Sequence, residues 1–96
     1  MSEEELRALE LLLLADPKVG DVVPGTHGLR KVRVAAGDKG RRGGGRVLYK
    51  DFERFGQIFF LFFVRKGEQD DLTPDQRRVV ARAVQAIEDE LEKRER

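Results

Sequence analysis

The sequence predicts an α+β domain in which a small, curved antiparallel sheet lies between two helices. Apolar residues recur at helical spacing near both ends of the chain, and three strand-like segments separated by turn residues lie between them. The length of 96 residues suits one domain, and 29 of these residues are Leu, Ile, Val or Phe, enough to build a core. We therefore expect residues 1–96 to fold as a single domain.

The first helix is expected over residues 2–15. Ser2 and Glu5 have the spacing of a capping box, and the glutamates of the first turn suit the positive end of the helix dipole. The helix should end at Asp16, because a residue that precedes proline is pushed out of the helical region. Residues 18–27 contain two glycines and a proline, which predicts an irregular connector.

Three strands are expected, over residues 29–35, 46–52 and 57–65. In the first of them, alternation places Lys31 and Arg33 together on the face opposite to the valines. The third strand is apolar at seven consecutive positions and rich in phenylalanine. This pattern predicts that both of its faces are covered and that it forms the centre of the sheet.

The second helix is expected to begin at Thr73. Thr73 supplies a hydroxyl N-cap, Pro74 the first helical position and Gln76 the reciprocal partner of a capping box. Apolar residues then recur every three or four positions as far as Leu91, which predicts an amphipathic helix.

The positive charge of the chain is concentrated in its middle. The net charge is only +1, but residues 27–50 contain eight Lys or Arg against one Asp, while the segments on either side are both net negative. Such a block indicates a polyanion site, because each phosphate that a cation neutralises releases condensed counterions. The alternative is a solvated basic hairpin without a ligand.

Several classes of function are excluded by composition. The sequence has no Cys and a single His, so it offers neither a thiolate nucleophile nor a cysteine or multi-histidine metal site. A Ser-His-Asp set is not expected either, because the histidine stands in a glycine-rich connector with no second member at a predictable distance. The glycine-rich segment 40–45 lacks the Lys-Ser/Thr ending of a phosphate-gripping loop. We expect no cofactor and no metal. The longest apolar run has seven residues, so we expect a cytoplasmic protein without membrane contact.

The remaining chemistry is cationic. Lys31, Arg33, Arg46 and Lys66 are expected to converge on one face of the sheet. Arginines there would neutralise a phosphodiester, and a lysine crowded by cations can accept or donate a proton. This set is sufficient for metal-independent RNA cleavage by the neighbouring 2′-hydroxyl. Tyr49 either stacks on a base or belongs to the core, and His27 is either an acid-base group or incidental.

The sequence resembles a known family in several consecutive stretches. These are the run from Asp16 to Thr26, the run Gly28-Leu29-Arg30-Lys31-Val32-Arg33, the loop from Lys39 to Gly44, and Arg46-Val47-Leu48-Tyr49. Together they closely resemble the HigB-type branch of the RelE/ParE toxin superfamily. The resemblance implies a RelE-like fold and the toxin of a bacterial type II toxin-antitoxin system. Most members are ribosome-dependent endoribonucleases (mRNA interferases) that inhibit translation, and a co-expressed antitoxin, often of helix-turn-helix type, neutralises them.

Carried over by position, the resemblance assigns catalysis to the four cations already named. It also implies that a second group of residues contacts RNA or the ribosome, namely Arg30, Lys39, Arg41 and Arg42, with Tyr49 as a candidate for base stacking. The chain departs from the family pattern in three ways. It looks N-terminally shortened, because members usually begin with a further strand and helix, so a sheet edge is expected to be unpaired. His27 stands where glycine is usual, and Val64 where an aromatic is usual.

Two other functions remain open at this stage. The first is a non-catalytic or ParE-like member, which binds an antitoxin or inhibits DNA gyrase. The second is a basic RNA-binding module, for which affinity would fall steeply with salt while Lys31→Ala alone changed little. The density of basic residues expected across the sheet favours the nuclease over the ParE-like alternative.

Overall fold

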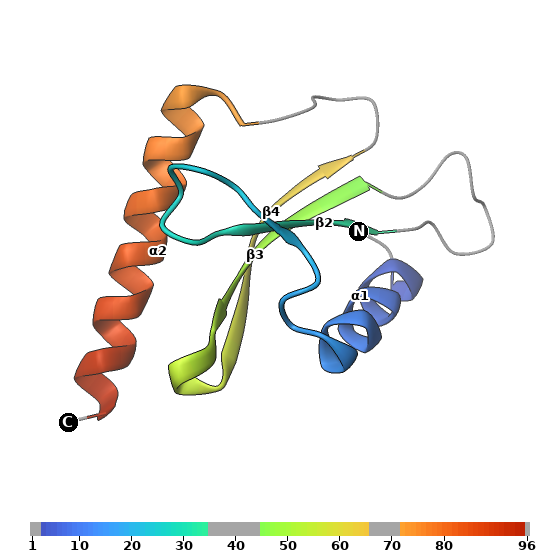
Figure 1. Cartoon of the computed structure of the whole chain (residues 1–96), viewed down its shortest axis with the longest axis horizontal. Coiled ribbons are helices and arrows are strands. Elements are labelled where there is room, and N and C mark those ends of the chain that lie inside the picture. The colour runs from blue at the N-terminus through green and yellow to red at the C-terminus, as the bar shows by residue number, and fades with distance from the viewer. Residues whose placement is uncertain (1–2, 35–44, 66–71, 96) are drawn as a thin grey trace.

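The computed structural model describes residues 3–34, 45–65 and 72–95, and these form an α+β fold (Figure 1). The elements in chain order are α1 (Glu3–Ala15), β1 (Asp21–Val22), β2 (Arg30–Val34), β3 (Gly45–Phe52), a 3-10 turn (Glu53–Phe55), β4 (Gln57–Arg65) and α2 (Pro74–Glu95). The predicted fold class, with a helix on either side of an antiparallel sheet, is confirmed. The strand β1 is an addition, since it lies in the segment predicted to be an irregular connector.

The sheet has four strands in the order β1-β2-β3-β4, and each neighbouring pair is antiparallel. The prediction that β4 forms the centre is wrong, because β3 lies between β2 and β4 while β4 is the last strand in the order. Most side chains of β4 are only partly buried, and Phe60 keeps 44% of its surface exposed. Within the described ranges no strand pairs with the outer edge of β4.

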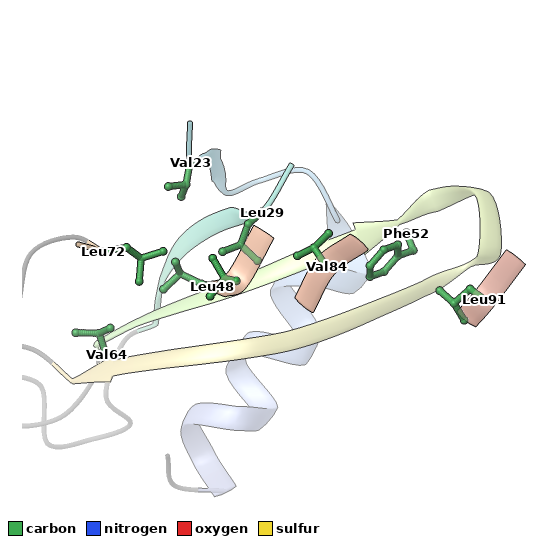
Figure 2. Close-up of a cluster of buried hydrophobic side chains, with 9 residues drawn as sticks. Val23, Leu29, Leu48, Phe52, Val64, Leu72, Val84 and Leu91 are labelled. Carbon is green, nitrogen blue, oxygen red and sulfur yellow. The ribbon is translucent and has the colours of Figure 1, made fainter. Parts of the chain in front are cut away.

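The side of the sheet that faces α2 carries the larger core cluster. Figure 2 shows Leu48 and Phe52 of β3, Val64 of β4 and Val84 and Leu91 of α2 among its members. Leu29 and Val23, on either side of the β1–β2 turn, also belong to the cluster, as do Leu72 and Val80. Because Leu29 and Val84 are fully buried, α2 is fixed across this face by apolar contact.

The other side of the sheet packs against α1. Leu9 and Leu13, one turn apart, are the two buried apolar side chains of this helix, and they meet residues from two strands. These are Val32 and Val34 of β2 and Val47 and Tyr49 of β3. α1 therefore covers the β2–β3 part of the sheet.

The predicted start of α2 is confirmed in detail. The Gln76 backbone N–H donates to the Thr73 hydroxyl at 3.1 Å, and the Thr73 N–H donates to the Gln76 side-chain carbonyl at 2.9 Å, which is a capping box. The helix continues past Leu91 to Glu95, where Arg54 pairs with Glu95 at 3.1 Å. Neither of the described helices is both long enough and apolar enough to span a membrane.

Candidate nucleic-acid interface

Three of the predicted cations share one face of the sheet. Arg33 of β2 lies directly opposite Arg46 of β3, and directly opposite residues on neighbouring strands project to the same side. Lys31 lies two residues before Arg33 and therefore projects to that side as well. It is opposite Leu48, whose side chain belongs to the α2-side core. We call Lys31, Arg33 and Arg46 the cationic strip.

The strip is accessible to a ligand. Arg33 is exposed, and Lys31 and Arg46 are half-buried. Its position at the margin of the α2-side core gives it an apolar floor, because Val64 lies opposite Arg46 on β4 and is 8% exposed. Val64 is the position where the resemblance implies an aromatic, so this buried valine leaves no aromatic face for a base at that position.

Directly opposed like charges destabilise a sheet, in general by roughly 0.2–1 kcal/mol for a cross-strand pair. Arg33 and Arg46 are such a pair. Planar guanidinium groups match phosphate oxygens, so two arginines that project to the same side of neighbouring strands are suited to a phosphate ligand.

Four of the other predicted cations fall in segments that the structure leaves undescribed. Lys66 follows β4 and lies outside the described residues, as do Lys39, Arg41 and Arg42. The segment that contains these last three joins the end of β2 to the start of β3. Arg33 and Arg46 stand next to those two strand ends, so the loop connects at the strip.

Tyr49 is a core residue, which corrects its assignment to RNA contact. Its side chain has 0% exposure, so neither face of the ring is open to a base. The hydroxyl donates to the Pro17 carbonyl at 2.8 Å and accepts from the Gly20 backbone N–H at 3.0 Å. Of the two alternatives left open by the sequence, burial in the core is the one observed.

Arg30 is engaged in the structure of the connector. Its guanidinium group donates to the Gly20 carbonyl at 2.7 Å and to the Lys18 carbonyl at 3.1 Å. As the neighbour of Lys31 on β2, it projects to the opposite side from the cationic strip. Contact between Arg30 and RNA stays a prediction.

Arg30 and Tyr49 together attach the connector to the sheet, a role that sequence reasoning missed. The available signal was a tyrosine on a strand predicted to be buried, because a buried phenol hydroxyl usually finds a polar partner. Gly20 provided a second signal, since a Cβ there would lie 2.8 Å from the Lys31 carbonyl oxygen. Only a residue without a side chain allows this close approach to β2.

His27 lies away from the strip, in the turn before β2. Its φ of 62° is in the left-handed region that favours glycine. The Nε2 atom lies 3.4 Å from a carboxylate oxygen of Glu88 on α2. His27 thus connects the β1–β2 turn to α2, and it is not part of the cationic strip.

A second charged group lies between α1 and the end of β3. The Lys18 amine is 2.8 Å from a Glu53 carboxylate oxygen and 3.5 Å from one of Asp51. The hydrogen bond from Lys18 lowers the pKa of Glu53 below 4.5, and the bond to Glu53 raises the pKa of Lys18 above 10.5. Because this group joins opposite charges, it carries no excess positive charge for an anion.

A comparison of the chain with models of known protein families finds no match. Within the described ranges, no three histidine, aspartate or glutamate side chains are grouped so that they could hold a metal ion.

Proposed function

We propose that this protein is a RelE-like toxin of the HigB type, the toxin component of a type II toxin-antitoxin system, which cleaves mRNA on the ribosome and so inhibits translation. The observation that carries the proposal is the pairing of Arg33 with Arg46, with Lys31 on the same side of β2. The net positive block at residues 27–50 surrounds this pair. It would strengthen attraction to RNA over distances of about 10 Å at moderate salt.

Four side chains would divide the proposed reaction between them. The 2′-hydroxyl attacks the adjacent phosphorus, the bond from phosphorus to the 5′-oxygen breaks, and a 2′,3′-cyclic phosphate and a 5′-hydroxyl end result. Arg33 and Arg46 would bind the phosphate oxygens and stabilise the negative charge of the pentavalent phosphorane. Guanidinium groups keep their protons, so proton transfer from the 2′-oxygen and to the 5′-oxygen would fall to Lys31 and Lys66.

The proposed partners follow from this role. Translated mRNA is the substrate, the ribosome presents it, and a cognate antitoxin, of helix-turn-helix type in the proposal, neutralises the toxin. Lys39, Arg41 and Arg42 would contact RNA or the ribosome from the loop that connects at the strip. The proposed activity uses no cofactor and takes place in the cytoplasm.

Translation-coupled cleavage of mRNA in a reconstituted extract tests the proposal. The wild type should cut mRNA only when ribosomes are present and translating. The double variant Arg33→Ala plus Arg46→Ala should be inactive, because it removes both phosphate ligands. The control variant Arg82→Ala plus Lys93→Ala removes two exposed cations of α2 and should cut as the wild type does. Circular dichroism establishes that all three proteins fold.

A folded wild type that cuts no mRNA would contradict the nuclease function. Assays of DNA gyrase supercoiling would then distinguish a ParE-like inhibitor from a protein that only binds an antitoxin. Equal cleavage by both double variants would retain the nuclease function but remove it from the cationic strip.

A further inference from the structure

A groove of about 570 Å³ lies between α1 and β4, on the opposite side of the sheet from the cationic strip. Ile58 and Phe60 of β4 form its floor, and Arg7, Glu10, Leu11 and Leu14 of α1 line its wall. We call it the α1–β4 groove. It is distinct from the proposed nuclease site, because that site lies on the α2 side of the sheet.

The groove exists because α1 covers only part of the sheet. Leu9 and Leu13 of this helix pack toward β2 and β3, and on the same side of β4 only Ile58 and Phe63 pack against this cluster, both of them partly buried. Leu14 is 81% exposed, Leu11 is 62% exposed and Phe60 is 44% exposed. Contiguous apolar surface of this kind, bounded by charged residues, marks an interaction site.

We propose that the occupant of this groove is a second copy of the chain, bound around a twofold axis that sets the two α1 helices antiparallel. The groove offers both surfaces of an apolar contact. The exposed side chains of Leu11 and Leu14 lie beside Ile58 and the exposed Phe60 of β4. A twofold interface uses the same patch on both subunits, so the exposed apolar side chains of the two copies would cover one another.

The charges of the groove fit this arrangement. Arg7 and Glu10 lie about one turn apart on the same flank of α1, and both line the groove. When two copies of this flank meet antiparallel, Arg7 of each copy comes alongside Glu10 of the other, which pairs opposite charges twice. A parallel arrangement would instead set each charge against its own kind. The patch is therefore self-complementary in charge.

The mass of the protein in solution, measured by light scattering during gel filtration over a range of concentrations, tests the proposal. The wild type should form a dimer of twice the 11.0 kDa chain mass. Phe60→Lys should raise the dissociation constant by about tenfold or more, because a charged amine would be buried in the apolar contact. The control Val79→Lys, at a 62% exposed valine of α2, should leave the dimer unchanged.

Charge-reversal variants test the proposed antiparallel arrangement of the two α1 helices. Arg7→Glu alone and Glu10→Arg alone should each weaken the dimer, since each opposes like charges across the axis. The double variant Arg7→Glu plus Glu10→Arg should restore it. A wild type that remains monomeric at every concentration would overturn the proposal. A dimer that resists Phe60→Lys and all three charge variants would overturn it too, because the interface would then lie elsewhere.

Discussion

Arg33 and Arg46 lie directly opposite each other on the antiparallel strands β2 and β3, at the end of the sheet where the basic loop begins. Two like charges in this relation oppose folding, and strand sequences generally avoid them. We therefore expect the pair to reduce stability and a bound phosphate to offset that effect. Stability and the proposed activity should respond in opposite directions when the pair is broken.

Arg33→Thr should raise the free energy of unfolding while it lowers mRNA cleavage. Removal of one guanidinium group ends the cross-strand repulsion, and threonine suits an exposed strand position, so we expect a gain of roughly 0.2–1 kcal/mol. Urea titration followed by circular dichroism measures the gain. A lower unfolding midpoint for Arg33→Thr than for the wild type would show that the opposed arginines do not destabilise the protein.

Tyr49→Phe should destabilise the protein through a single oxygen atom. The change keeps the buried ring but leaves the Pro17 carbonyl and the Gly20 N–H without their partner. The expected loss is about 1–3 kcal/mol, the cost of unsatisfied buried polar groups. Urea titration measures the loss, and amide hydrogen exchange should become faster at Gly20. Unchanged exchange at Gly20 would mean that the hydroxyl does not hold the connector.

Gly45→Ala should reduce both stability and cleavage, because Gly45 stands next to Arg46 at a close contact with β4. A Cβ at Gly45 would meet the backbone oxygen of Val64 and lie 3.0 Å from the Cα of Arg65. Backbone atoms cannot move aside as a side chain does, so β3 should shift, at a cost of about 1–3 kcal/mol. The shift would displace Arg46 from Arg33.

Gly25→Ala is the matched control for this change. Gly25 has a φ of 75°, but a Cβ there would meet no atom within 4 Å. It should cost about 1 kcal/mol from backbone strain alone and leave cleavage by the folded protein unchanged, since Gly25 lies in the β1–β2 turn. Equal cleavage by the two alanine variants would argue against a role for Arg46 placement.

The pair of Lys18 with Glu53 should stabilise the fold only while Glu53 is ionised. The hydrogen bond from Lys18 lowers the pKa of Glu53 in the folded state, so the folded state binds that proton less readily than the unfolded state. Its contribution is present above 4.5, the ordinary pKa of glutamate, and is lost as the pH falls through the lowered value. Because both groups are exposed, the effect is small.

Glu53→Gln checks this dependence. The variant should be less stable than the wild type near neutral pH, and the difference should vanish in strong acid, where Glu53 is protonated. Urea titrations across this range measure it. A difference that stays constant with pH would show that packing, and not ionisation, is what the substitution removes.

Sequence reasoning predicted the elements whose signals are local. The capping box of Thr73 and Gln76 needs only a spacing of three residues, and it forms as expected. Alternation likewise predicts that Lys31 and Arg33 lie on one face of a strand, and this prediction needs no knowledge of strand pairing. The register of β2 and β3 then places Arg46 on that face, as expected from the sequence, although this expectation depends on strand pairing and not on a local pattern.

The errors came from contacts between distant segments. The apolar run of β4 suits burial on both faces, which led to the wrong expectation that β4 is the central strand. The order of strands is set by their pairing, which makes β4 the last strand and leaves a groove over one of its faces. Tyr49 was ambiguous for a related reason. Its burial depends on α1 and on the Pro17 carbonyl, 32 residues earlier in the chain.

The chemistry of the cut ends tests most directly whether the cationic strip cleaves RNA through the 2′-hydroxyl. mRNA fragments produced during translation are isolated, and their ends are examined by enzymatic ligation and phosphatase treatment. The proposed roles of Lys31, Arg33 and Arg46 predict a 2′,3′-cyclic phosphate or 3′-phosphate on the upstream fragment and a 5′-hydroxyl on the downstream one. A 3′-hydroxyl with a 5′-phosphate would require attack by water, and it would contradict this account.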